Sequence, residues 1–376
     1  MKALFQCDDF SEALKAISPV FSDKIKVSLR AHRQESFNLL PENGGLLLVA
    51  ESAHTQIRAF VPCSDVSGAG CVLNYREAVS RAKAFKGLVA FHYMENEKRA
   101  ELSNKNKAYS MPATIVAPSG FEPAPEWQTT ASRTPLQRIT KRASGSIGDS
   151  FDYMAALCIN PVNERIEFCA MNGRQMQYEF LFSSALAEVF KEERLIWDVK
   201  ALAAWLAALP KKTDAIRLAG TKDFLFLQAG RTQYASRYYK SGYPDINGIL
   251  NRRSEATAKI AFSHKDLIAA LKELEPMTST ANRSGTFTFH ETEARLTVKE
   301  SGLSLPIKHC GKKFKIALPI KDLRKLVELA ESPDGLLTLE LTGNTGPAFI
   351  ENGQQALAVI MPMKVFDDAE TSEKAA

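Results

Sequence analysis

One arrangement of predicted secondary structure occurs three times along the chain. Amphipathic helices are predicted at 74–85, 198–209 and 319–330, and they begin about 122 residues apart. Each is followed by segments typical of strands, at 88–93, 215–218 and 336–341. A second series of predicted helices, at 9–17, 134–143 and 263–274, keeps nearly the same period. Three such units account for almost all of the 376 residues, so a repeated fold is the strongest constraint on this protein.

The segments between the helices alternate apolar and polar residues, as in 165–170, 285–290 and 294–298. This period of two is typical of antiparallel strands with one buried face. The predicted class is therefore α+β, with two helices of each unit packed on an antiparallel sheet. Residues rich in Pro and Gly at 118–125 and 242–248 mark the boundaries. We expect domains at 1–126, 127–250 and 251–365, followed by an acidic, disordered tail at 366–376.

The composition is that of an ordinary globular protein, with 45% hydrophobic and 24% charged residues. The sequence contains no apolar stretch of about 20 residues and no signal-peptide pattern at its start, so a cytoplasmic location is expected. The six cysteines lack zinc-ligand spacing and are interpreted as reduced, mostly buried residues.

Basic residues recur on the predicted helices. The helix at 135–147 carries no acid, whereas Asp322, Glu328 and Glu331 balance the basic residues of the last helix. The net charge is +5, a mild excess that permits a polyanionic partner without requiring one. On any single helix these residues can equally form a solvated face. Their recurrence favours contact with phosphates, which gives binding that is independent of sequence and sensitive to salt. The candidate DNA-binding residues are Lys24, Arg76, Arg81, Lys83, Arg138, Lys141, Arg142, Lys200, Lys321 and Arg324.

Motifs of the common enzyme classes are absent from the sequence. It contains no phosphate-binding loop, no dinucleotide fingerprint, no H-E-x-x-H and no nucleophile elbow. The six histidines are isolated from one another, which argues against a metal site. A non-catalytic protein without a cofactor is therefore expected. Two other classes stay open at this point: an enzyme of nucleic-acid metabolism with converging carboxylates, and a monomeric DNA-binding scaffold.

Two segments resemble a known family. The ending Ala356-Leu-Ala-Val-Ile-Met-Pro-Met-Lys-Val365 closely resembles the C-terminal strand and M-P-M-[RK] ending of the bacterial beta sliding clamp, the processivity subunit of the replicative DNA polymerase. Tyr243-Pro-Asp-Ile-Asn-Gly-Ile-Leu250 is similar to the F-P-D-Y segment that joins the second and third domains of that family. Weaker similarity is found at 11–20 and at 170–176, and the resemblance runs in order along the whole chain.

This resemblance implies a ring of two chains, head to tail, lined by twelve helices and threaded by double-stranded DNA. The implied partners are a replicative polymerase, a clamp loader and other proteins whose short peptides dock in a hydrophobic pocket. The implied dimer contacts are Tyr109 and Met111 on one side and Leu274 and Met277 on the other. The implied pocket residues are Tyr153, Met154, Met171, Gly173, Arg174, Met176, Pro244, Gly248, Ile249, Val359, Met361, Pro362, Met363, Lys364 and Val365.

The sequence also departs from the family pattern. Where the family has A-T-D-G-H-R-L, this chain has Arg174 at the His position and Gln175 at the Arg position. Gly248 stands where a basic residue is common, and residues 366–376 extend beyond the usual ending. These departures suggest a divergent clamp with altered partner preference. The methionines of the implied pocket are flexible enough to accept several peptides, although the same residues could fill an interdomain core.

Overall fold

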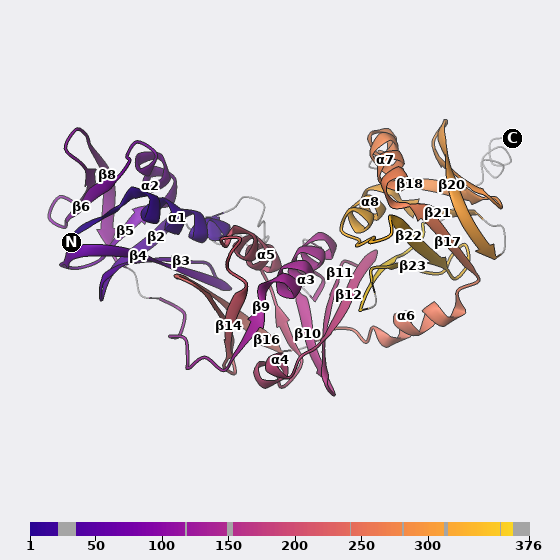
Figure 1. Ribbon diagram of the computed structural model, residues 1–376, viewed down its shortest axis with the longest axis horizontal. Coiled ribbons are helices and arrows are strands. Elements are labelled where there is room, and N and C mark those ends of the chain that lie inside the picture. The colour runs from indigo at the N-terminus through magenta and orange to yellow at the C-terminus, as the bar shows by residue number, and fades with distance from the viewer. Residues whose placement is uncertain are drawn as a thin grey trace, which may run out of the picture. The chain divides into compact units, whose positions relative to one another are not determined.

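The computed structural model describes all residues except 22–34, 117–118, 149–152, 241, 280–281, 312–314, 354 and 364–376. The chain separates into two compact units (Figure 1). Unit 1 comprises 1–144, 149–166 and 182–241, and unit 2 comprises 145–148, 167–181 and 242–376. The three-domain division expected from the sequence stays a prediction.

The order of elements is nevertheless threefold within the described residues: strand, helix, four strands, helix, three strands. We call these sets the first, second and third repeats. The first repeat consists of β1 (Lys2–Gln6), α1 (Cys7–Ile17), β2 (Ser36–Glu42), β3 (Gly45–Glu51), β4 (Thr55–Ser67), β5 (Cys71–Asn74), α2 (Tyr75–Ala82), β6 (Leu88–Met94), β7 (Arg99–Ser103) and β8 (Ala108–Ile115), with a short 3-10 helix η1 (Ser18–Phe21) after α1.

The second repeat adds one short helix, α4, to this order. It consists of β9 (Thr129–Ser132), α3 (Arg133–Ser146), η2 (Tyr153–Ala155), β10 (Leu157–Val162), β11 (Arg165–Met171), β12 (Gln175–Phe182), α4 (Ser184–Val189), β13 (Arg194–Ile196), α5 (Val199–Ala208), β14 (Ala215–Gly220), β15 (Phe224–Ala229) and β16 (Thr232–Lys240).

The third repeat follows a linker that itself contains α6 (Asn247–Asn251) and η3 (Arg252–Glu255). It consists of β17 (Ala258–Ser263), α7 (His264–Leu274), η4 (Glu275–Met277), β18 (Ser284–Phe289), β19 (Glu293–Val298), β20 (Ser301–Gly311), β21 (Lys315–Pro319), α8 (Ile320–Glu328), β22 (Leu336–Leu341), β23 (Ala348–Glu351) and β24 (Ala356–Ile360).

All six helices predicted from the repeat are confirmed, and so are the strands named above. Local signals explain their starts. The Asn74 side chain accepts a hydrogen bond from the backbone N–H of Glu77 over 3.1 Å, which caps α2. Ser263 caps α7 in the same way. The short helices α4 and α6 were not predicted, because their few residues carry too little periodicity.

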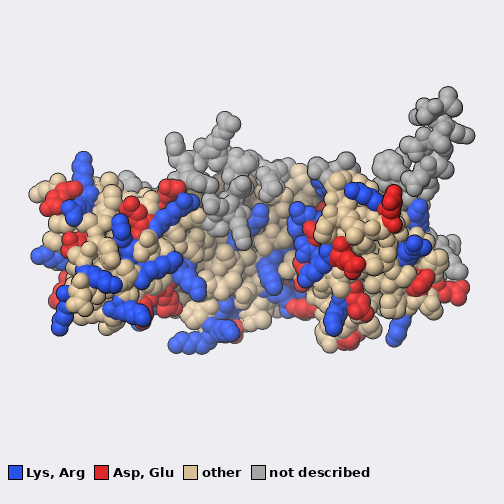
Figure 2. Space-filling view, turned by 90° about the horizontal axis from the view of Figure 1, so that it is seen from above, with Lys and Arg blue, Asp and Glu red and all other residues tan. Residues whose placement is uncertain are grey.

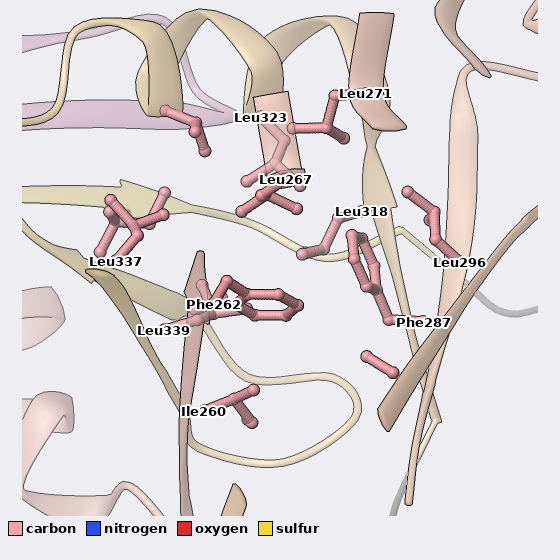
Figure 3. Close-up of a cluster of buried hydrophobic side chains, with 14 of the residues drawn as sticks. Ile260, Phe262, Leu267, Leu271, Phe287, Leu296, Leu318, Leu323, Leu337 and Leu339 are labelled. Atoms are coloured by element: carbon pink, nitrogen blue, oxygen red, sulfur yellow. The ribbon is translucent and has the colours of Figure 1, made fainter. Parts of the chain in front are cut away.

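The core of unit 2 illustrates how each repeat is held together (Figure 3). In Figure 1, α7 and α8 lie next to each other, and both pack their apolar faces on the strands. Complete burial makes this packing specific: Leu271→Ala should cost about 2–5 kcal/mol of stability. The cluster includes Ile260, Phe262, Leu267, Leu271, Phe287, Leu296, Leu318, Leu323, Leu337 and Leu339.

Successive repeats are joined by one kind of strand junction. In unit 1, β16 pairs antiparallel with β4, with Ser236 opposite Thr55 and Tyr234 opposite Ile57. In unit 2, β24 pairs antiparallel with β12, and Ala358 lies opposite Gln177. The last strand of one repeat thus pairs with the fourth strand, β4 or β12, of the preceding repeat. No helix in the described part of the chain is both long and apolar enough to span a membrane.

Candidate functional site

The basic residues of the repeated helices differ in exposure. Four of the candidates are exposed: Arg76, Lys83, Lys141 and Lys321. Another four are half-buried: Arg81, Arg138, Lys200 and Arg324. Arg142 is only 3% exposed, so it is a poor candidate for a phosphate contact in this conformation. Lys24 lies outside the described residues.

Arg324 and Arg81 are two of the candidate cations that contact other side chains. Arg324 on α8 forms ion pairs with Glu275 and with Glu328, the latter at 2.8 Å. Arg81 on α2 lies over the ring of Tyr109, with 5.6 Å between the guanidinium carbon and the ring centroid. Figure 2 shows acidic side chains among the basic ones on the face it draws. The candidates most accessible to an anionic partner are therefore the exposed Arg76, Lys83, Lys141 and Lys321.

An apolar patch lies at the end of β24. Met361 and Met363 are each 36% exposed, although the strand before them is fully buried. The backbone holds them in place: the N–H of Met361 donates to the carbonyl oxygen of Arg174 over 2.7 Å, and that of Met363 to Ala317 over 2.8 Å. Gly173 and Arg174 are exposed beside this end of the strand. We call Gly173, Arg174, Met361, Pro362 and Met363 the methionine patch.

The structure brings together only part of the pocket implied by the resemblance. Two of its three segments, 171–176 and 359–363, meet through the β12–β24 pairing, in which Met176 lies opposite Val359. The methionines divide, because Met171 and Met176 are buried whereas Met361 and Met363 are exposed. Tyr153 and Met154 are half-buried in unit 1, and Lys364 and Val365 lie outside the described residues.

The third segment is the linker of unit 2. Pro244 and Gly248 are exposed and Ile249 is half-buried. The linker is anchored at both ends: the hydroxyl of Tyr243 lies 3.5 Å from the sulfur of Cys169, and Arg253 binds carboxylates on the sheet. The sequence carried no signal for this anchoring, because the partners lie 74 to 98 residues away in the sequence.

The carboxylate of Glu340 is the centre of that anchor. It is buried on β22 and accepts hydrogen bonds at 2.5 Å from Arg253 and from Lys259. Glu351 binds the other end of the same guanidinium over 2.6 Å. Burial opposes ionisation of Glu340, but the two cations outweigh it and hold its pKa below the ordinary value.

In unit 1, the junction between β4 and β16 corresponds to the β12–β24 junction that carries the methionine patch. It is filled by aromatic and polar side chains. Trp197 stacks on Tyr239 with 4.1 Å between ring centroids, and His54 hydrogen-bonds the Tyr239 hydroxyl through Nδ1. Burial, together with Arg237, lowers the pKa of His54. Next to this cluster Asp198 precedes α5 in the left-handed region, with φ of 59°. Burial raises the pKa of Asp198 to about 6, and Thr55 is its main opposing contact.

The residues implied at the dimer contact also divide into accessible and buried ones. Tyr109 on β8 is half-buried and lies edge-on to Phe85 at 5.6 Å between centroids. Met277 is 37% exposed. Met111 and Leu274 are buried in their own units, at 2% and 1% exposure, so substituting them would disturb the core as well as any interface.

Comparison with known proteins agrees with the resemblance found in the sequence. No family model matches the chain. The curated beta sliding clamp of Chlamydia muridarum is 26% identical over 147 residues, or 38% of this chain and 39% of that protein. That of Chlamydia pneumoniae is 26% identical over 152 residues, or 39% of this chain and 40% of that protein. The match therefore spans about two fifths of the length of these relatives.

Solved structures extend the likeness to the whole chain. The DNA polymerase III beta subunit of Thermotoga maritima has a TM-score of 0.82 at 14% identity, over 97% of this chain and all of that one. The beta subunit of Pseudomonas aeruginosa and the sliding clamp of Bacillus subtilis each have a TM-score of 0.82 at 12% identity, with the same coverage. The α+β fold expected from the sequence is confirmed, and it is the fold of these beta subunits.

Proposed function

We propose that two copies of this chain close head to tail into a ring around duplex DNA, and that the ring tethers a DNA polymerase without catalysing a reaction itself. The observation that carries this proposal is the repeated strand junction. The fourth strand of one repeat pairs with the last strand of the next, as β4 does with β16 and β12 with β24. The equivalent strands that remain are β20, the fourth strand of the third repeat, and β8, the last strand of the first. In the described part of the chain, neither has a strand paired along the equivalent edge.

The repeats also predict the register of the missing junction. Alignment of the three repeats through their strand pairings places Tyr109 at the position of Tyr234 and Ala358. The same alignment places Ser301 at the position of Ile57 and Gln177. Because Tyr234 lies opposite Ile57 and Ala358 opposite Gln177, Tyr109 should lie opposite Ser301 of the partner subunit. Two such contacts close the ring and leave no open edge.

A closed ring explains the modest charge of the candidate DNA-binding helices. Once DNA is enclosed, topology retains it, so weak phosphate contacts suffice and permit sliding. The exposed Arg76, Lys83 and Lys141 are proposed to make these contacts, together with the half-buried Arg138 and Lys200. No base readout is expected, since phosphate contacts carry no sequence information.

The methionine patch is proposed as the docking surface for the polymerase, the clamp loader and other partners. Its exposed thioethers can adapt to different apolar side chains, and Arg174 can meet a carboxylate or carbonyl group of a peptide. Tethering turns polymerase rebinding into an intramolecular event, which is how a non-catalytic ring raises processivity.

The test combines mass and topology. One chain has a mass of 41.5 kDa, and light scattering on the full chain should give twice that mass. The ring, loaded on nicked circular DNA, should stay bound in high salt and be released when the DNA is linearised. A protein that is monomeric at micromolar concentration, or whose retention does not depend on circular DNA, would overturn the proposal.

A further inference from the structure

We infer that residues 364–376 of one chain cross the ring junction and bind the outer sheet face of the partner subunit's first repeat, where acidic residues of this segment meet Lys2, His92 and Arg99. The inference rests on the proposed ring. We define the outer face as the side of β1, β6, β7 and β8 opposite to the core residues Phe5 and Phe91. It exposes Lys2, His92 and Arg99, with Glu101 and Ser110 half-buried.

The first step is the behaviour of the linker after the first repeat. The chain leaves β8 and packs on the corresponding sheet face of the second repeat before β9 begins. Phe121 is buried there against Phe224, Phe226 and Ala235. The linker after a repeat thus binds the outer face of the repeat that follows.

The linker after the second repeat does the same by ion pairing. Arg253 reaches Glu340 on β22 and Glu351 on β23 at 2.5 and 2.6 Å. Both carboxylates lie on the side of the sheet away from the core residues Leu339 and Ile350. Two linkers of unlike sequence therefore use equivalent surfaces.

The third repeat ends at the same structural position. β8 ends with Ile115 paired to Cys71, β16 with Lys240 paired to Arg194, and the chain after β24 with Met363 bridged to Ala317. Residues 364–376 follow this point, as residues 116–128 follow β8. The two segments are of equal length and can span up to about 40 Å when extended. In a ring, the repeat that comes next is the first repeat of the partner subunit.

The outer face of the first repeat carries charges opposite in sign to those on the equivalent face of the third repeat. In unit 2, Lys259 lies opposite Glu340, which neutralises it and receives Arg253 from the linker. At the equivalent positions of the first repeat, Lys2 lies opposite His92. Arg99 donates through Nε to Ser110 over 2.6 Å. Basic groups thus outnumber the single carboxylate of Glu101 on this face.

The segment that would meet this face is acidic. Residues 364–376 contain Asp367, Asp368, Glu370 and Glu373 against two cations, Lys364 and Lys374. In unit 2 a basic linker residue binds an acidic face, and here an acidic segment would bind a basic face. The two interactions have the same charge complementarity with the signs reversed. The other reachable surface, the methionine patch of the same chain, offers only Arg174 as a described cation, so it is the less complementary site.

The experiment measures the dimer dissociation constant by sedimentation at low and high salt. Deleting residues 366–376 and substituting Lys2→Glu with Arg99→Glu should each weaken the dimer about 3- to 10-fold at low salt. The combination should be no worse than either change, because both remove the same interaction. The matched control is Lys211→Glu with Lys212→Glu, an exposed pair that should leave the dimer unchanged. Thermal melting of each variant confirms that it is folded.

A second readout locates the segment directly. A photoreactive phenylalanine analogue in place of Phe366 should crosslink to residues 88–103 of the other chain in dimers made from two differently tagged copies. Unchanged dimer affinity, additive effects, or crosslinks only within one chain would overturn the inference. Tighter partner-peptide binding after the deletion, with the dimer unaffected, would place the segment on the methionine patch instead. A full-length chain that never dimerises would reject the proposed ring itself. That outcome can be told apart from a failure of the present inference, in which the dimer forms without the contribution of residues 364–376.

Discussion

The backbone N–H of Arg237 donates to the carbonyl oxygen of His54 over 2.9 Å. Met361 makes the equivalent bond to Arg174 in the other junction, over 2.7 Å. The two junctions therefore share a backbone and differ in side chains. Tyr239 is held by His54 and Trp197 in the first, whereas Met361 and Met363 stay exposed in the second. This difference is the reason that one docking surface per chain, the methionine patch, is proposed.

Removing the exposed thioethers should weaken docking. Met361→Ala with Met363→Ala should weaken binding of a Q-L-x-L-F-type peptide at least about 10-fold. Each methionine side chain that the peptide covers contributes on the order of 1–2 kcal/mol to binding. Fluorescence anisotropy measures the affinity. Leu336→Ala is the matched control, since Leu336 is 38% exposed but lies elsewhere in unit 2. Full affinity in the double variant would place the docking site elsewhere.

DNA binding should depend on exposed cations and not on paired ones. Arg76→Ala, Lys83→Ala and Lys141→Ala together should lower DNA affinity equally for all sequences. The dependence of log affinity on log salt should flatten by about 0.9 for each phosphate that is no longer neutralised. Arg324→Ala should change DNA affinity little, because Glu275 and Glu328 already neutralise Arg324. A larger effect from Arg324→Ala than from the triple variant would contradict this assignment.

Asp198 should make stability depend on pH. Its folded-state pKa is about 6, above the roughly 3.9 of an unfolded aspartate, so stability is lost as pH rises from about 4 to about 6. Asp198→Asn removes the buried charge and should stabilise the protein at pH 7–8 by on the order of 1–3 kcal/mol. The gain should shrink towards pH 4. Denaturant unfolding at several pH values gives the comparison, and a gain independent of pH would exclude this cause.

Glu340 should hold the linker on unit 2. Glu340→Ala leaves Arg253 and Lys259 without their shared carboxylate and should cost about 1–3 kcal/mol. Because the folded-state pKa of Glu340 is lowered, its contribution is present at neutral pH and is lost as pH falls below the unfolded value. Hydrogen exchange of residues 247–255 should accelerate in this variant. Glu351→Ala, at the exposed end of the pair, should have a smaller effect; equal effects would refute the central role of Glu340.

Local patterns in the sequence were sufficient for the six repeated helices, the strands named from their alternation and the threefold order. A cap such as Asn74 acts within three residues, and strand alternation extends over six. The ending Met361-Pro362-Met363 also predicted one part of the proposed docking surface, through its resemblance to known clamps. These features depend on neighbours along the chain, so they can be read without coordinates.

Tertiary structure alone decided which candidates are accessible and which pair with residues distant in the sequence. Arg138, Lys141 and Arg142 form one basic run in the sequence, yet Arg142 is buried and Lys141 exposed. The sequence likewise could not separate Met176 from Met361, or connect Arg253 with Glu340, because those outcomes depend on strands that meet from distant parts of the chain. Exposure is decided when long-range contacts exclude water from one side chain and leave its neighbour in solvent.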